Sequence, residues 1–164
     1  MTARPAVLIR PPDEGEIDQL ARIWHDGWHD AHAHLMPAGL TSARTIASFA
    51  ERLPGLFPDT SVAGPVGAPV GFCVLRGDEL YQLYVVGAAR GQGIAAALVE
   101  DAEQRLAARG VTTAWLACAI GNTRAARFYE KCGWHHARNA VLELPAKGAM
   151  FAVEVWRYEK QLPR

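Results

Sequence analysis

A glycine-containing turn joins a predicted strand to a predicted helix near the middle of the chain. The segment 79–86 (ELYQLYVV) is rich in residues that favour β-strands. Beyond the turn, apolar residues recur at helical spacing from Ile94, and Gly110 stands where a helix C-terminus often has glycine. The sequence AARGQGIAAAL (88–98) therefore predicts a strand that runs through a tight turn into a helix.

The same turn has the chemistry of a phosphate site. The first backbone N–H groups of a helix have no partners within the helix, and the helix dipole makes that end positive. Gly91 and Gly93 lack side chains that would cover these groups, Arg90 adds a cation, and the alanines at 95–97 keep the first turn low. The turn predicts a phosphate or pyrophosphate site. A glycine turn packed against a neighbouring segment is the alternative.

Two familiar phosphate motifs fit this turn poorly. A Walker loop requires Lys-Ser or Lys-Thr after its last glycine, and neither is present. The spacing of Gly91, Gly93 and Ala96 matches GxGxxA of dinucleotide-binding proteins, which carry an acidic residue about 20 positions later. No Asp or Glu occurs between Glu103 and Glu130, which disfavours that interpretation.

Composition narrows the class of protein. The 164 residues suit one domain, and 17 basic residues balance 17 acidic ones. A neutral chain gives no electrostatic reason to expect nucleic acid or an anionic membrane as a partner. No segment is apolar enough to cross a bilayer, and the proline-broken N-terminus does not resemble a signal peptide. Three scattered cysteines without CxxC spacing predict reduced thiols in a cytoplasmic protein.

The remaining patterns predict a mixed α/β domain over residues 1–164, without a linker. Asp13 and Glu16 have capping-box spacing at the start of the first helix, and Ser42 is the predicted cap of the second. Pro54 and Gly55 are expected to end that second helix. The predicted helices are 13–28, 42–55, 91–110 and 122–133, and the predicted strands are 7–12, 60–64, 68–75, 79–86, 111–120, 140–145 and 150–162.

Two motifs together resemble a known family. Arg90-x-x-Gly93-x-Ala95 is similar to the (Q/R)xxGx(G/A) acyl-CoA loop of the GCN5-related N-acetyltransferase (GNAT) superfamily. The segment 122–134 (NTRAARFYEKCGW) resembles its next signature, a short helix opened by Asn and containing Phe-Tyr. The order of elements also matches. The resemblance implies a mostly antiparallel sheet of six to seven strands, with a splayed central strand and helices on both faces.

The resemblance also implies the cofactor contacts. The backbone of the central strand would pair with pantetheine as another strand would, and the N–H groups of the turn would hold the pyrophosphate. Gly87 stands where the family often has proline, which is a mild departure. Asn122 would reach the pantetheine arm, although it also suits a plain N-cap. The implied acetyl-CoA contacts are Leu83, Tyr84, Val85, Arg90, Gly91, Gln92, Gly93, Ile94, Ala95, Asn122, Ala125 and Phe128.

Two residues are the catalytic candidates. Tyr129 matches the family's usual general acid, and a phenol, with an ordinary pKa near 10, is a suitable proton donor to a thiolate. Its alternative is an aromatic side chain packed on the sheet. Glu79 lies six residues before Val85, the offset at which some members carry a base. Its alternative is a solvated turn residue.

The segment WHDGWHDAHAHLMP (24–37) matches the wall of the family's acceptor site. Trp28, His29, His32 and His34 are therefore the candidates for binding the acceptor, whereas Trp24 is expected in the core. The alternative places both tryptophans in the core and the histidines on a polar face. His25 and His29 have a metal-like spacing, but HExxH is absent and no cysteine is near, so no metal is expected.

The resemblance implies an N-acetyltransferase that moves an acetyl group from acetyl-CoA to a primary amine by direct attack. The acceptor would be a small molecule, an amino acid or a peptide, and the neutral chain argues against a strongly charged one. A non-catalytic domain that senses acyl-CoA is the alternative. The sequence leaves a homodimer open.

Overall fold

A computed structural model describes residues 7–163 and shows a seven-stranded sheet flanked by helices. The strand order is β1-β2-β3-β4-β5-β7-β6, and every neighbouring pair is antiparallel except β4 and β5. The elements are β1 Ile9–Arg10, η1 Glu14–Glu16, α1 Ile17–His32, α2 Ala38–Ala43, α3 Ile46–Leu56, η2 Phe57–Asp59, β2 Thr60–Ala63, β3 Gly71–Arg76, β4 Glu79–Val85, η3 Gly87–Ala89, α4 Ile94–Ala108, β5 Thr113–Ala119, α5 Thr123–Lys131, β6 His135–Ala146 and β7 Ala149–Gln161.

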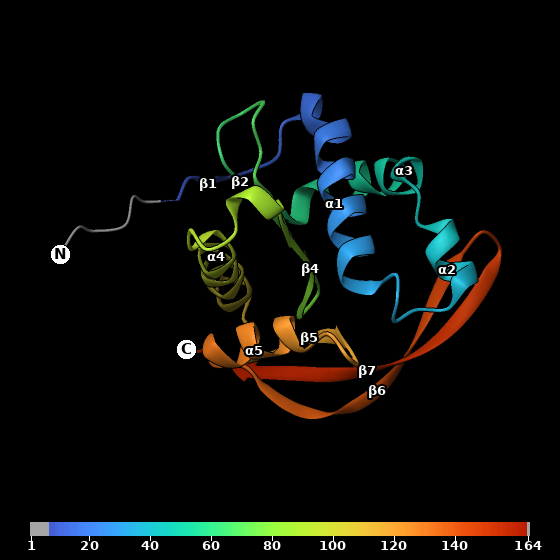
Figure 1. Ribbon diagram of the computed structural model, residues 1–164. Coiled ribbons are helices and arrows are strands. Elements are labelled where there is room, and N and C mark those ends of the chain that lie inside the picture. The colour runs from blue at the N-terminus through green and yellow to red at the C-terminus, as the bar shows by residue number, and fades with distance from the viewer. Residues whose placement is uncertain (1–6, 164) are drawn as a thin grey trace.

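Two hydrophobic cores lie on the two faces of the sheet. Alternate side chains of β3 point to opposite faces, as a strand requires. Cys73 and Leu75 pack with α4 and α5, whereas Phe72 and Val74 pack with α1 and α3. Figure 1 shows α4 and α1 on either side of β4. The prediction of helices on both faces of a mostly antiparallel sheet is therefore confirmed.

The N-terminal helices differ from the prediction. The segment 42–55 contains parts of two helices, and Ser42 lies inside α2. The cap of α3 is Thr45, whose extended backbone lets its side-chain oxygen accept the Ser48 N–H at 3.1 Å. Pro54 lies inside α3 and does not end it, since the helix continues to Leu56. Proline lacks an N–H, so one backbone hydrogen bond is lost in the last turn of the helix. The capping box at Asp13 is present, at the start of η1.

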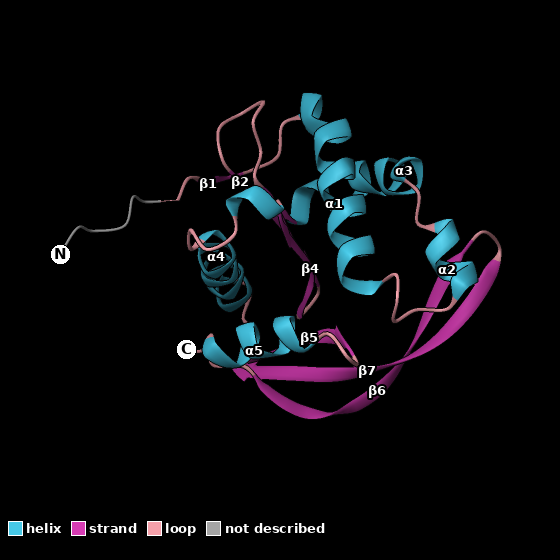
Figure 2. Ribbon diagram, in the orientation of Figure 1, coloured by secondary structure: helices cyan, strands magenta, loops and turns pink. Residues whose placement is uncertain are grey.

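The closing strands form a hairpin longer than predicted. β6 begins at His135 rather than at residue 140, because β7 extends far enough to pair with it. Figure 2 shows this hairpin passing beneath the other elements and rising beside α2. Phe151 of β7 lies close to Gly39 of α2 there. No helix within residues 7–163 has both the length and the apolar character needed to span a bilayer.

Candidate active site

The sheet opens between its two parallel strands. β4 and β5 pair at a single position, Glu79 opposite Trp115, supported by a bond of 3.2 Å from the Trp115 N–H to the Asp78 carbonyl. Beyond that point the strands diverge, although both continue for several residues. The central strand is therefore splayed, as the resemblance implies.

The divergence leaves part of the β4 backbone facing the gap. Val86 N–H donates to the Val70 carbonyl at 2.9 Å, and Tyr84 lies opposite Phe72 in the β3 register. Backbone hydrogen bonds alternate along an antiparallel pair, so Leu83 and Val85 direct their N–H and C=O groups away from β3. These groups are available to a ligand that lies in the gap like an additional strand.

The glycine turn follows at the end of β4. Gly91 and Gly93 have φ values of 81° and 80°, in the left-handed region that glycine enters without a steric cost. Gly93 is the N-cap of α4, and no side chain of the described residues donates or accepts a capping hydrogen bond at this helix end. The first backbone bond that closes the helix is from Ala97 N–H to the Gly93 carbonyl, at 3.1 Å. The preceding N–H groups therefore form the bare helix end predicted from the sequence.

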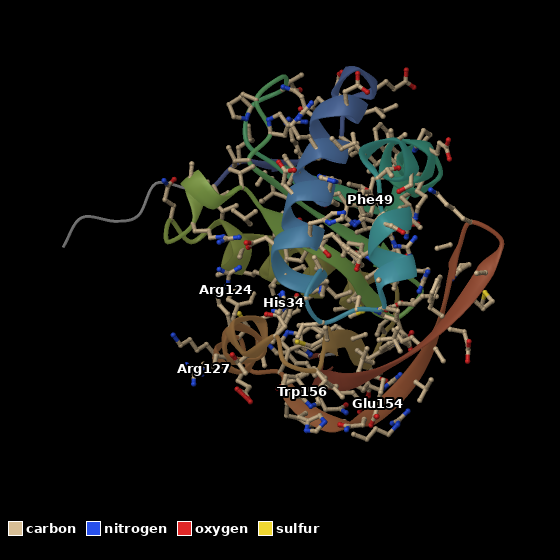
Figure 3. All side chains as sticks on the ribbon, turned by 45° about the vertical axis from the view of Figure 1, so that its right-hand side comes forward. His34, Phe49, Arg124, Arg127, Glu154 and Trp156 are labelled. Carbon is tan, nitrogen blue, oxygen red and sulfur yellow. The ribbon has the colours of Figure 1, made fainter. Side chains whose placement is uncertain are left out.

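Two arginines lie beside this turn and share one carboxylate. Arg90 donates to Asp30 of α1 at 3.1 Å, and Arg124 of α5 reaches the same oxygen at 3.5 Å. Hydrogen bonding to Arg90 holds the pKa of Asp30 below its ordinary value. Figure 3 shows Arg124 on the side of α5 near the end of α1, with Arg127 at the outer edge. Two guanidinium groups thus lie where anionic phosphates would meet the helix end.

A cavity of about 930 Å³ extends from this turn into the gap between the strands. Arg90 and Ala95 line it at either end of the turn, whereas the predicted residues Gly91, Gln92, Gly93 and Ile94 between them do not. Ile94 is the first residue of α4 and is buried in the core. His29 and His34 lie outside its lining. The predicted site residues that line the cavity are Trp28, His32, Glu79, Leu83, Tyr84, Val85, Arg90, Ala95, Asn122, Ala125, Phe128 and Tyr129.

Helix α5 brings Tyr129 to the cavity. Asn122 is the N-cap, and its side-chain oxygen accepts the Ala125 N–H at 3.3 Å. Tyr129 lies two turns further along, with its ring 5.3 Å from that of Phe128 and 6.3 Å from that of Trp134. Burial raises the pKa of Tyr129 well above its ordinary value, and neighbouring cysteines raise it further. The phenol is therefore protonated at neutral pH, as a general acid must be.

Glu79 begins β4 at the closed end of the splay. Its side chain is buried and accepts from Arg76 at 3.1 Å. Burial raises the pKa of Glu79, and the charge of Arg76 opposes that shift. The carboxylate is therefore neither a solvated turn residue nor an isolated base, because it lines the cavity as half of an ion pair.

The histidine-rich segment divides between two surroundings. Trp24 is fully buried, and Trp28 and His32 line the cavity beside Tyr84. His29 bonds to the Arg44 carbonyl at 2.6 Å in a separate surface depression. His34 is exposed (Figure 3). Among residues 7–163, no three His, Cys, Asp or Glu side chains are placed to hold a metal ion.

The burial of His32 predicts an acid-dependent loss of stability. Burial lowers the pKa of His32 to about 4 from 6.5, so between these values the unfolded chain binds more protons than the folded one. The free energy of unfolding therefore falls as the pH drops below 6.5, by about 2 kcal/mol at pH 5 from this group alone. Urea denaturation at pH 7 and pH 5 measures this difference.

The neighbouring His34 provides the control for this prediction. His32→Asn should remove most of the loss between pH 7 and pH 5, whereas His34→Asn should keep it because that side chain is exposed. An unchanged pH dependence in His32→Asn would contradict the assignment of the buried neutral imidazole.

Several residues that line the cavity were not predicted from the sequence. The inner end of the cavity is lined by Arg44, Arg52, Arg76 and Tyr81, and the hairpin adds Leu142 and Leu144. Arg52 lies one helical turn after Phe49 on the inner face of α3, which is a helical-spacing signal. The spacing does not show that this face meets a cavity, since that depends on where α3 packs.

Comparison with known proteins agrees with this geometry. The model of the acetyltransferase (GNAT) family matches residues 17–134. An uncharacterized N-acetyltransferase of Mycobacterium tuberculosis is 37% identical over 107 residues, which cover 62% of this chain and 66% of that protein. The match thus spans slightly less than two thirds of this relative. A homologous protein of Mycobacterium bovis, also named an uncharacterized N-acetyltransferase, matches to the same extent.

Solved structures share the fold along nearly the whole chain. A GCN5-related N-acetyltransferase from Rhodopseudomonas palustris superposes with a TM-score of 0.76 at 23% identity, covering 99% of both chains. The PaiA N-acetyltransferase from Thermoplasma acidophilum, solved in complex with coenzyme A, gives a TM-score of 0.71 at 16% identity, covering 95% of this chain and 99% of that one.

The splayed sheet, the bare helix end and the Asn-capped helix define a protein with the architecture of the acyl-CoA-dependent transferases. The family model covers most of the chain, and the two mycobacterial relatives are named N-acetyltransferases. The chain belongs to the GNAT family of acetyltransferases.

Proposed function

We propose that the chain forms one acyltransferase domain that moves an acetyl group from acetyl-CoA to a primary amine. A single observation carries this proposal: the open backbone of β4, the bare end of α4 and the Tyr129 side chain border one cavity. An extended amide-containing arm, a diphosphate and a thioester match these three features in that order. Solved relatives in complex with coenzyme A and with acetyl-CoA support the choice of cofactor.

The residues present fit this cofactor. The backbone N–H groups from Gly91 to Ala95 would hold the diphosphate, with the Arg90 and Arg124 side chains beside them. The Arg90 N–H itself donates to the Gly87 carbonyl at 3.2 Å. Leu83 and Val85 would pair with the pantetheine amides, and Asn122 lines the same channel. When bound, acetyl-CoA supplies an activated acetyl group as a thioester.

The reaction would proceed by direct attack in a ternary complex. The neutral amine forms a bond to the thioester carbonyl carbon, and the carbon–sulfur bond then breaks. Tyr129 donates its phenolic proton to the departing thiolate, and the amine nitrogen loses a proton to water or to the Glu79 carboxylate. Positioning of the two substrates and hydrogen bonding to the carbonyl oxygen from a β4 N–H would supply most of the acceleration.

Release of free thiol from acetyl-CoA in the presence of a panel of amines tests this proposal. We expect thiol release that depends on the amine, together with an N-acetylated product detected by mass spectrometry. A reaction without amine serves as the control for simple hydrolysis. Tight coenzyme A binding without turnover on any amine would contradict the proposal and favour a sensing domain.

A further inference from the structure

The inner end of the cavity contains three arginines, of which one pairs with a carboxylate among residues 7–163. We use "acceptor lobe" for the part of the cavity lined by Arg44, Arg52, Arg76, Glu79 and Tyr81. The buried Glu79 carboxylate pairs with Arg76. Within residues 7–163, no carboxylate oxygen lies within 4 Å of the Arg44 or Arg52 guanidinium. The lobe therefore holds two unneutralised positive charges in a chain whose net charge is zero.

Aromatic side chains fix the position of the Arg52 guanidinium. It lies 4.5 Å from the ring centre of Trp24 and donates a hydrogen bond to the Tyr81 hydroxyl. The Arg76 guanidinium lies 3.7 Å from the ring centre of Tyr81. Trp24 is fully buried, so Arg52 is held by a rigid part of the core. Its remaining N–H groups have no protein acceptor among the described residues.

Arg44 lies near Arg52 and is held by its backbone. Its carbonyl accepts a hydrogen bond from the His29 ring at the end of α2. Burial lowers the pKa of Arg44, and the positive charge of Arg52 lowers it further. Repulsion between two partly buried guanidinium groups lowers the stability of the folded protein. An anion bound between them would offset this repulsion. Planar guanidinium groups favour carboxylates because two parallel hydrogen bonds can form.

Other acidic residues do not supply this anion. Glu143 lines the cavity but is exposed on β6. Asp30 pairs with Arg90 and Arg124, at the other end of the cavity. The two uncompensated charges thus face the space that the cofactor's thioester end would leave for the acceptor.

From this juxtaposition, and resting on the proposed function, we infer that the acceptor is an amino-acid-like molecule whose carboxylate binds to Arg44 and Arg52. Its amine would then point toward Tyr129 and the splay. The lobe therefore selects a charged acceptor, in contrast to the expectation from the neutral chain. The chain is neutral overall because the acidic residues lie elsewhere.

Matched ligands and variants test this inference. The ligands are α- and ω-amino acids, each paired with its carboxamide, which keeps the amine and the size but lacks the charge. The variants are Arg44→Gln and Arg52→Met, and the latter keeps an apolar stem against Trp24. Arg52→Lys keeps the charge without the planar fork. Arg22→Gln, at an exposed position of α1, is the control for net charge.

We expect the best amino acid to exceed its carboxamide by at least about tenfold in kcat/KM, which corresponds to one charge-assisted contact. That preference should fall to within about threefold in Arg44→Gln and in Arg52→Met, recover partly in Arg52→Lys, and persist in Arg22→Gln. Preference for carboxamides or polyamines, or an unchanged preference in both charge-removing variants, would overturn the inference.

Calorimetric titration of the same ligands into the complex with coenzyme A separates this inference from the proposed function. Arginine-dependent binding of amino acids without turnover would support the carboxylate site and contradict the acetyltransfer reaction. Turnover of amines without any preference for a carboxylate would support the acetyltransfer reaction and contradict the carboxylate site. Absence of both binding and turnover of amino acids would overturn the inference.

Discussion

Replacing Gly93 with aspartate is expected to weaken coenzyme A binding by about 100-fold or more. Gly93 is the N-cap of α4, and within residues 7–163 no side chain forms a capping hydrogen bond with the N–H groups that follow it. The new carboxylate would stand beside the proposed diphosphate site, where like charges repel and the bare helix end is lost to the ligand. A loss of about 100-fold corresponds to less than about 3 kcal/mol, which one poorly screened charge repulsion can supply. Calorimetric titration with coenzyme A measures the change.

Gly93→Asn is the matched control for this variant. Gly93 has a φ of 80°, and asparagine enters the left-handed region about as readily as aspartate does. Asparagine thus reproduces the size and the backbone cost of aspartate without its charge. We expect Gly93→Asn to bind coenzyme A more weakly than the wild type and clearly more tightly than Gly93→Asp. Equal losses in both variants would mean that shape rather than charge governs the turn, and unaltered affinity in both would place the coenzyme elsewhere.

Tyr129→Phe is expected to lower kcat by about 100-fold or more while changing coenzyme A affinity less than about threefold. The ring would remain packed beside Phe128 and Trp134, so the wall of the cavity would keep its shape. Only the proton donor to the thiolate would be missing. Steady-state kinetics with acetyl-CoA, together with titration of coenzyme A, separates these two effects.

Tyr158 offers a control from the same core. Its ring is buried, and its hydroxyl bonds to Glu130 at 3.4 Å. It does not line the cavity. Tyr158→Phe should therefore keep kcat within about threefold of the wild type. A parallel loss of kcat and coenzyme affinity in Tyr129→Phe would indicate a structural tyrosine.

Local patterns predicted the backbone structure around the proposed cofactor site well. The turn at 88–98 and the helix that opens at Asn122 depend on neighbouring residues in the chain, and both form where expected. Glycine spacing, capping chemistry and apolar periodicity are visible within a few residues. One local prediction was wrong: Thr45 rather than Ser42 caps α3, because Ser42 lies inside α2 and the chain leaves that helix before α3 begins.

The acceptor end could not be predicted in the same way. Arg44, Arg52 and Tyr81 come from three different elements. Their charges meet because α3 packs Phe49 against Trp24 of α1, which brings the arginine over the indole. His29 and His34 share a segment with His32, yet only His32 faces the cavity. The spacing of residues along one helix cannot show which face of that helix will meet a strand that is distant in the sequence.

The sequence by itself determined the bare helix end and the Asn-capped helix, because backbone conformation and capping arise from adjacent residues. The resemblance implied a splay, but only the tertiary structure showed that β4 and β5 separate directly after Glu79. It also showed that, within residues 7–163, two arginines of the resulting cavity have no carboxylate partner. Splaying and charge pairing depend on which distant segments meet when the two cores form. Long-range packing therefore determines the chemistry of the acceptor lobe, whereas the local backbone conformation determines the proposed binding site for the cofactor.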